Sequence, residues 1–212
     1  MTRRLYDITP PITKALAVWP GDTPPSREVL LDMAKGDNLT FSTLHATVHL
    51  GAHADGPNHY GLDAHSIGEQ ALEIYIGPCQ VIHVDVKRSA RVELSHINQQ
   101  IETERVLIGT GSYADPTKFN EDFAGLSPAL VDDLHDKGVK LVGIDTPSVD
   151  VFESKDLPAH KRFLAHDMVI LEGLVLKDVP TGMYELIALP LRLMDFDASP
   201  VRAVLRTINP VC

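Results

Sequence analysis

The sequence is poor in cysteine, and its two cysteines stand far apart. Cys79 and Cys212 are the only ones among 212 residues, and no CxxC pair occurs. This excludes a disulfide framework and a zinc site built from thiolates. Any metal ion that this chain binds must therefore be held by nitrogen and oxygen ligands.

Long hydrophobic runs and an excess of basic residues are also missing. The apolar stretches are far shorter than the ~20 residues that a membrane-spanning helix needs. The two arginines near the start are not followed by the apolar segment of a signal peptide. The formal net charge of -10 repels phosphate backbones. We therefore expect a cytoplasmic protein that binds neither membranes nor nucleic acids.

The composition is that of an ordinary folded protein, with 44% apolar and 23% charged residues. No repeat or linker divides the chain, so a single domain over residues 1–212 is expected. Apolar, β-branched runs predict strands at residues 80–86, 106–108, 140–144, 168–176, 184–191 and 201–208.

Two helices are predicted between these strands. One covers residues 127–137, with Ser127 as N-cap, Pro128 at the first helical position and Gly138 just past the end. The other covers residues 94–103, where apolar residues recur at spacings of three and four. Strands with interspersed helices indicate an α/β or α+β domain and leave the topology open.

The most informative stretch is VHLGAHADGPNHY, which places His49, His53, Asp55 and His59 within eleven residues. Imidazole and carboxylate are the usual ligands of zinc and similar ions when thiolates are absent. In a straight strand these residues share a face, but His49 and His53 stand about 13 Å apart, too far for one ion. A bend at Gly51 and a turn at residues 56–57 would bring them together.

A histidine-rich polar loop without a ligand is the alternative interpretation of this stretch. Four other histidines, His65, His83, His96 and His135, are interpreted as structural or solvated. His45 continues the odd-numbered spacing of this stretch but is interpreted as an ordinary strand histidine.

A further signal is Glu172, a lone carboxylate in the apolar run MVILEGLVL.

Glu172 must be protonated, paired or bound to metal if it is buried, because an unpartnered buried charge is costly. A role as a metal ligand would explain Glu172. A position at the strand end before Gly173, or an ion pair with an arginine such as Arg192 or Arg206, would also explain it. His160 and His166 are both candidates for a further imidazole ligand. Sequence spacing does not choose between them.

Together these residues resemble the cyclase-like metal hydrolases, which share an HxGxHxDxPxH signature, and especially the bacterial kynurenine formamidases. Residues 49–59 fill every fixed position of the signature. The resemblance extends over nearly the whole chain, through the segments YDITPPI, VWPGDTP, YIGPCQVIHV, GIDTPSVD, ILEGLVL, YELIALPL and DASPVRAVLR.

The resemblance implies a role for each matching residue. His49, His53 and Asp55 would bind one divalent ion, and Asp55, His160 and Glu172 a second, with Glu172 also within reach of the first. His59 would be the general acid/base. Trp19 would contact an aromatic substrate, although a lone tryptophan covering the core is the plainer interpretation.

The resemblance also implies a fold, ions and an assembly. It implies a mixed β-sheet, barrel-like core with peripheral helices, of the swivelling β/β/α type. The expected ions are two Zn²⁺ per subunit, with Mn²⁺ as the alternative, and the expected assembly is a homodimer or homotetramer.

The expected reaction is hydrolysis of an aromatic formamide, N-formyl-L-kynurenine, to L-kynurenine and formate. A related hydrolase of cyclic amides, imides or lactams is the nearest alternative, since the signature identifies the metal site better than the substrate. A metal-binding protein without catalysis is a third, which the presence of His59 argues against. Asp145 and Ser148 follow a strand and remain unassigned.

Overall fold

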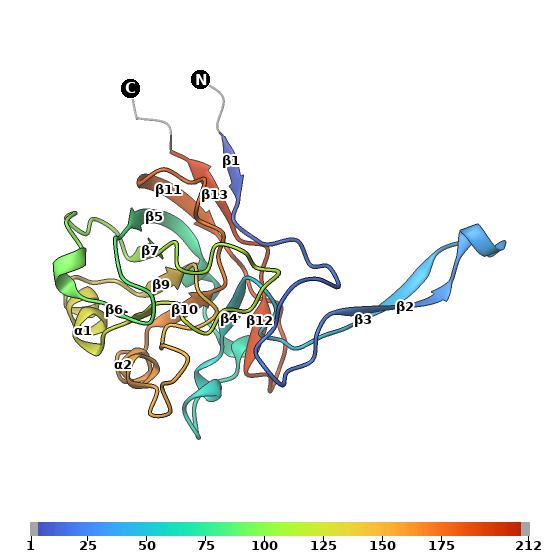
Figure 1. Ribbon diagram of the computed structural model, residues 1–212, viewed down its shortest axis with the longest axis horizontal. Coiled ribbons are helices and arrows are strands. Elements are labelled where there is room, and N and C mark those ends of the chain that lie inside the picture. Colours follow the sequence, from blue (N-terminus) through green and yellow to red (C-terminus); the bar gives the residue numbers. More distant parts are fainter. Residues whose placement is uncertain (1–3, 209–212) are drawn as a thin grey trace.

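A curled nine-stranded sheet forms the body of the computed structural model, which describes residues 4–208 (Figure 1). In sheet order its strands are β1 (Leu5–Asp7), β13 (Val204–Thr207), β11 (Gly182–Ile187), β5 (Ile76–His83), β7 (Arg105–Gly109), β9 (Leu141–Ile144), β10 (Val169–Glu172), β4 (His53–Asp55) and β12 (Ala198–Pro200). The pairs β5-β7, β7-β9 and β9-β10 are parallel, and the other neighbouring pairs are antiparallel. The α/β class expected from the sequence is confirmed.

Two helices, α1 (Pro128–Asp136) and α2 (Pro158–Ala165), cover one face of this sheet. Alternate residues of each strand point to opposite faces. On β7, Val106 and Ile108 pack in the cluster beneath the helices, while Leu107 belongs to the cluster on the other face. The sheet is therefore buried on both sides, as its nearly continuous apolar strands require.

Helix α1 begins and ends as its sequence predicts. The Ser127 hydroxyl accepts a hydrogen bond from the Leu130 backbone N–H at 3.2 Å, and Pro128 occupies the first turn. Gly138, with φ of 85°, follows the end of the helix in the left-handed conformation. The predicted caps are thus confirmed.

Each of the six predicted strand runs overlaps a strand. β5 and β7 are longer than predicted, and the other four strands are shorter. The run 168–176, for example, contains β10, which ends at Glu172 because Gly173 has φ of 65°. The run 201–208 contains only β13.

The helix predicted over residues 94–103 is wrong. A single 3-10 turn, η5 (Leu94–His96), is present, and Ile97 is already extended. The Gln80 side chain donates to the Gln100 carbonyl at 2.8 Å and accepts from the Glu102 N–H at 3.1 Å. These contacts with β5 replace the hydrogen bonds that a helix would make.

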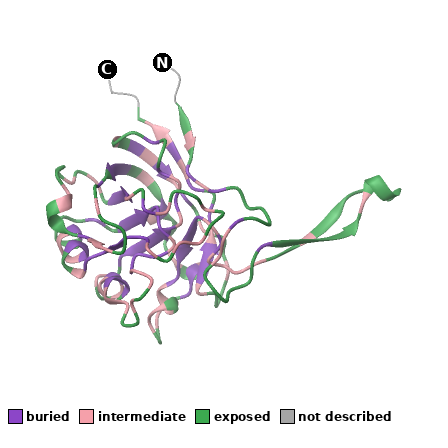
Figure 2. Ribbon diagram, viewed as in Figure 1, coloured by how far each residue is buried: buried purple, intermediate pink, exposed green. Residues whose placement is uncertain are grey.

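A long two-stranded arm, residues 26–45, was not predicted. It consists of β2 (Ser26–Leu31), η1 (Met33–Lys35) and β3 (Phe41–His45), and it projects away from the body (Figures 1 and 2). His45 lies on β3, and its imidazole is 3.0 Å from the Glu28 carboxylate, in line with its interpretation as a strand histidine.

The remaining elements are short. They are β6 (Arg91–Val92), β8 (Gly125–Leu126), η2 (Pro57–His59), η3 (Ile67–Glu69) and η4 (Leu72–Tyr75). Within residues 4–208, none of the helices has the length and apolar character to cross a membrane.

Candidate metal centre

Neighbouring strands β4 and β10 bring three acidic and imidazole side chains onto one face of the sheet. The strands run antiparallel, and His53 stands directly opposite Glu172. Asp55 follows two residues after His53 and so points to the same side. Ala52, before His53, and Ala54, between His53 and Asp55, lie in the apolar cluster on the opposite face. Strand alternation therefore separates the polar site from the core.

The bend expected at Gly51 is present, with φ of 58°. A Cβ atom at Gly173 would lie 2.1 Å from the Gly51 carbonyl oxygen, so the two backbones meet closely here. The bend brings the His49 ring next to His53, with ring centroids 4.9 Å apart. His49 and His53 are therefore close enough to bind one ion, which a straight strand would not allow.

Helix α2 delivers a further imidazole, and it is that of His160. Asp150 accepts hydrogen bonds from the backbone N–H groups of Ala159 and His160, which caps the helix. The same carboxylate lies 2.9 Å from His160 Nδ1. His166, the other candidate, lies just past the far end of the helix and contacts Asp132 at 2.7 Å.

Four side chains converge around the Asp55 carboxylate. Asp55 Oδ1 lies 3.3 Å from His49 Nδ1 and 3.5 Å from His53 Nε2, and Oδ2 lies 3.6 Å from His160 Nε2. Glu172 completes the group, with one oxygen 3.3 Å from His53 Nε2 and the other 3.7 Å from His160 Nε2. Each carboxylate thus faces two or more imidazoles.

The donor set fits a metal ion. Both Asp55 oxygens are buried and accept no hydrogen bond from the described residues. Buried carboxylate oxygens are costly to leave without a partner. Two histidine–aspartate groupings that contain Asp55 bring their ligand atoms within 4.8 Å of one another. A cation among these atoms would satisfy both oxygens.

Hydrogen bonds behind the cluster aim its imidazole and carboxylate atoms inward. His53 Nδ1 donates to the Gly51 carbonyl at 2.9 Å, which leaves Nε2 facing the carboxylates. The Asp150 contact does the same for His160. Glu172 accepts from the Val149 backbone N–H at 2.7 Å. Such outer contacts fix the tautomer and orientation of metal-binding imidazoles.

The electrostatics of the site favour cations. Burial by itself lowers the pKa of His49, but the Asp55, Asp197 and Glu172 carboxylates raise it to about 9. His160 follows the same pattern, and Asp150, Asp55 and Glu172 raise its pKa to about 10. Burial opposes ionisation of Asp55, yet the surrounding imidazoles hold its pKa well below the usual value. Without metal, protons on imidazole balance the carboxylates.

His59 lies beside the cluster at the end of η2. Its ring centroid is 4.3 Å from that of His49, and its Nδ1 is 3.5 Å from Asp197 Oδ2. Burial, the largest influence, lowers its pKa below the ordinary value. His59 is therefore largely neutral at neutral pH and able to accept a proton.

Sequence reasoning missed two carboxylates that orient these histidines, Asp150 and Asp197. Asp197 Oδ2 lies 3.0 Å from His49 Nε2 as well as near His59. Both aspartates occur in segments that carry the resemblance, GIDTPSVD and DASPVRAVLR. That position was the available signal, but neither segment shows which imidazole its aspartate meets.

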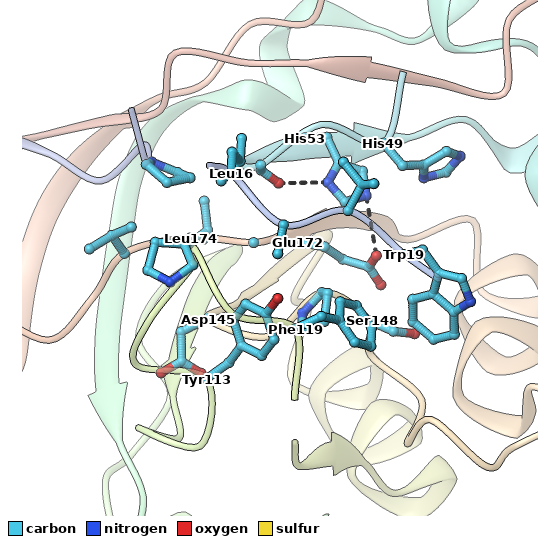
Figure 3. Close-up of a pocket in the computed structure, with 18 of the residues that line it drawn as sticks. Leu16, Trp19, His49, His53, Tyr113, Phe119, Asp145, Ser148, Glu172 and Leu174 are labelled. Atoms are coloured by element: carbon cyan, nitrogen blue, oxygen red, sulfur yellow. Dashed lines mark hydrogen bonds and ion pairs between the residues drawn. The ribbon is translucent and has the colours of Figure 1, made fainter. Parts of the chain in front are cut away.

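A cavity of about 540 Å³ opens onto this cluster and is lined by His49, His59, His160 and Glu172. Aromatic side chains from two loops form part of its wall, namely Trp19 from the first and Tyr113 and Phe119 from the second (Figure 3). Trp19 is 38% exposed and packs against Phe119 and Phe152, with ring centroids 5.5 and 5.1 Å away. Trp19 thus covers apolar side chains and also faces the cavity.

Asp145 and Ser148 line the cavity too. The Asp145 carboxylate accepts hydrogen bonds from the backbone N–H groups of Thr110 and Gly111, at 2.9 and 2.8 Å. Burial raises its pKa above the ordinary value. These contacts hold the loop after β7 in place, which accounts for Asp145 without a role in chemistry.

A family model described as "Putative cyclase" matches residues 6–151. The chain belongs to the cyclase family. Its similarity to a kynurenine formamidase from Delftia acidovorans (strain DSM 14801 / SPH-1) reaches 45% identity over 210 residues, or 98% of this chain and 100% of the relative. The resemblance inferred from the HxGxHxDxPxH signature is confirmed.

Solved structures of similar proteins share the fold of this chain. A "predicted metal-dependent hydrolase" from Bacillus stearothermophilus is 28% identical, with a TM-score of 0.81 over 97% of this chain and 99% of its own. Isatin hydrolase A from Labrenzia aggregata is 20% identical, with a TM-score of 0.82 over 98% of this chain and 94% of its own. The second likeness concerns the fold alone.

Proposed function

We propose that this protein is a kynurenine formamidase, which hydrolyses N-formyl-L-kynurenine to L-kynurenine and formate in tryptophan degradation. Full-length similarity to the Delftia acidovorans enzyme supports the choice of substrate. The observation that carries the chemistry is the convergence of three imidazoles and Glu172 on an Asp55 carboxylate whose buried oxygens accept no hydrogen bond from the described residues. That arrangement lies at a cavity with an aromatic wall.

We assign the ligands of two divalent ions, Zn²⁺ or alternatively Mn²⁺, to this cluster. His49, His53 and Asp55 would hold one ion, and Asp55, His160 and Glu172 the other. Bound ions would supply Lewis acidity, which polarises a carbonyl group and makes water acidic enough to ionise near neutral pH. Asp55 suits the shared position because its two oxygens face different imidazoles.

His59 is assigned the proton transfers. As a neutral imidazole it removes a proton from the water that attacks the formyl carbon. It then delivers that proton to the aniline nitrogen as the C–N bond breaks, so that kynurenine leaves as a neutral amine. Asp197, 3.5 Å from Nδ1, favours the tautomer that keeps the proton on that nitrogen and leaves Nε2 available.

We assign to the aromatic wall the binding of the substrate's anthraniloyl ring. Trp19, Tyr113 and Phe119 provide flat apolar surfaces that bind an aromatic ring and displace water from it. Because the formyl group itself is small, the affinity must come from the remainder of the substrate. Trp19 is therefore the side chain expected to influence substrate binding most.

The test is steady-state hydrolysis of N-formyl-L-kynurenine, followed by the absorbance of kynurenine. Activity should disappear on chelation and return with Zn²⁺ or Mn²⁺. His59→Ala should lower kcat by about a hundredfold to ten-thousandfold, the usual range for loss of an acid/base group. His45→Ala is the matched control, since His45 lies on the exposed arm and pairs only with Glu28 among the described contacts.

Two outcomes would count against this proposal. Stoichiometric metal without turnover would overturn the formamidase assignment, and cyclic amides, imides and lactams would then be assayed. Unchanged activity in His59→Ala would remove that residue from the reaction. We also propose a homodimer or homotetramer, and a cytoplasmic location stays a prediction from the sequence.

A further inference from the structure

Arg91 lies outside the cavity but is linked to the metal centre through Asp150. It stands on β6, and its guanidinium donates to Asp150 Oδ1 at 2.7 Å. The other oxygen of that carboxylate, Oδ2, lies 2.9 Å from His160 Nδ1. The three side chains therefore form a continuous chain of contacts, which ends at an imidazole that faces the Asp55 and Glu172 carboxylates.

The ion pair between Arg91 and Asp150 is largely shielded from water. The Asp150 side chain is 1% exposed and that of Arg91 is 22% exposed. Among the described ion pairs, Arg91 is the only partner of Asp150 outside the metal centre. Removal of one partner of a buried pair leaves the other charge without compensation. Arg91 is thus the group that balances Asp150 independently of any ion.

The pair also controls the direction of the carboxylate. Both oxygens belong to one rigid group, so a contact that fixes Oδ1 also fixes Oδ2. The contact of Oδ1 with Arg91 is shorter than its contact with the Ala159 backbone N–H, at 3.2 Å. Without the guanidinium, the carboxylate could turn and move Oδ2 away from His160 Nδ1. The imidazole would then lose the hydrogen bond that fixes its tautomer and its direction.

The loop between Asp150 and α2 is held by the same guanidinium. Arg91 Nη2 donates to Ser154 Oγ at 3.3 Å. The loop ends at Leu157, whose φ of 45° lies in the left-handed region that is unfavourable for L side chains. Leu157 has no polar side-chain atom with which to cap α2, so the Asp150 carboxylate caps the helix instead. The start of α2, which carries His160, therefore depends on a carboxylate that Arg91 holds in place.

We propose that Arg91 is a positioning residue for the metal centre, which acts through Asp150 to hold the His160 imidazole in the direction that metal binding requires. This role rests on the proposed function of His160 as a ligand, and it gives control of that ligand to a side chain outside the cavity. Removal of the guanidinium should therefore weaken the binding of one ion and leave the aromatic wall unchanged.

A neighbouring ion pair provides the matched control. Arg88 lies three residues before Arg91 and donates to Asp122 at 2.6 Å. The two side chains are 53% and 46% exposed, and exposed pairs contribute little to stability. The Asp122 carboxylate also accepts from the Asn120 side chain and contacts no imidazole among the described residues. Loss of Arg88 thus removes the same kind of pair without affecting the metal centre.

Competition for Zn²⁺ between the metal-free protein and a chromophoric chelator tests the role without any substrate. The wild type should bind two ions. Arg91→Met should weaken one of the two binding steps about tenfold to a hundredfold, the usual cost of losing a side chain that orients a metal ligand. Arg88→Met should leave both steps unchanged. Wild-type affinities in Arg91→Met would overturn the proposal.

Arg91→Lys keeps the positive charge and guards against a variant that fails to fold. Lysine lacks the planar fork with which arginine makes several contacts at once, so it should hold Asp150 less firmly. The weakened ion should bind to Arg91→Lys more tightly than to Arg91→Met and less tightly than to the wild type. If Arg91→Met does not fold, wild-type affinity for both ions in Arg91→Lys would overturn the proposal.

Nuclear magnetic resonance of the metal-free protein reports on the imidazole directly. The His160 Nδ1 proton is buried against Asp150, so it should give a low-field resonance that exchanges slowly with water and is absent from His160→Gln. The resonance should persist in Arg88→Met and disappear or broaden in Arg91→Met, an effect that a change in stability alone would not have on a folded protein. An unaltered resonance in Arg91→Met would refute the link to His160. If these differences occur in a protein that does not hydrolyse N-formyl-L-kynurenine, the proposed function fails and the role of Arg91 stands.

Discussion

Metal binding should be strongly linked to proton release, because the metal-free site holds protons where ligands are needed. The pKa of His49 is raised to about 9 and that of His160 to about 10. Both imidazoles therefore carry a second proton and a positive charge at neutral pH. Each must lose that proton to bind a cation. Filling the site should release about two protons from these residues.

The magnitude follows from that stoichiometry. Each released proton makes the apparent association constant rise about tenfold per pH unit, so two make it rise roughly a hundredfold. We expect this slope from about pH 7 to pH 8.5, and a shallower slope once His49 loses its proton near pH 9. At fixed total metal, a drop of one pH unit should therefore empty a large fraction of the sites.

The assay is a competition for Zn²⁺ between the metal-free protein and a chromophoric chelator, corrected for the chelator's own protonation. Calorimetry in two buffers with different ionisation heats gives the proton count independently. A His45→Ala protein should behave as the wild type. An affinity that does not change with pH, or that falls as pH rises, would refute the protonated-imidazole account of this site.

The same pKa shifts predict how the stability of the metal-free protein depends on pH. A pKa raised on folding contributes stability that is fully present below the unfolded value of about 6.5. That contribution is lost as pH rises through the folded values of about 9 and about 10. Urea denaturation of the metal-free protein should show a free energy of unfolding that falls as pH rises from about 6.5 to about 10. The free energy of unfolding of the metal-loaded protein should fall less.

Three further changes should have distinct effects. Asp197→Asn should lower kcat about tenfold to a hundredfold and change KM less than twofold, because it disturbs the orientation of His59 and leaves the aromatic wall intact. An unchanged kcat would show that Asp197 does not orient His59. Trp19→Ala should raise KM about tenfold, and Trp19→Phe should restore most of the affinity, whereas equal KM values for both would exclude ring contact. Gly173→Ala should cost more than about 3 kcal/mol in urea denaturation, since its Cβ would meet the Gly51 carbonyl at 2.1 Å. Gly138→Ala has a similar positive φ but open space around it, so it should cost only about 1 kcal/mol, and similar costs for the two would contradict the clash.

Local sequence signals predicted the elements that are stabilised locally. The caps of α1 are contained in a few neighbouring residues, Ser127, Pro128 and Gly138, and the structure has them all. The helix over residues 94–103 failed because the side chain of Gln80, about twenty residues away, takes up its backbone hydrogen bonds. Apolar spacing carries no information about such a distant partner.

The candidate site shows the same limit. His49, His53, Asp55 and His59 lie within eleven residues, so their chemistry could be inferred from one stretch. The spacing within that stretch could not choose between His160 and His166 as a further imidazole, nor could it identify the carboxylates that orient the histidines. His160 depends on the position of α2, and Asp197 is separated from His49 by 148 residues. Only the path of the chain brings these groups together.

The cavity is built partly on strands and partly on loops, which differ in how readily their residues can change during evolution. The proposed metal ligands His53, Asp55 and Glu172 stand on adjacent strands whose register leaves little room for change. Trp19, Tyr113 and Phe119 stand on loops, where replacements and insertions are tolerated. A lineage with this scaffold is free to exchange the loop side chains and acquire new substrates while the strand-borne chemistry is inherited unchanged.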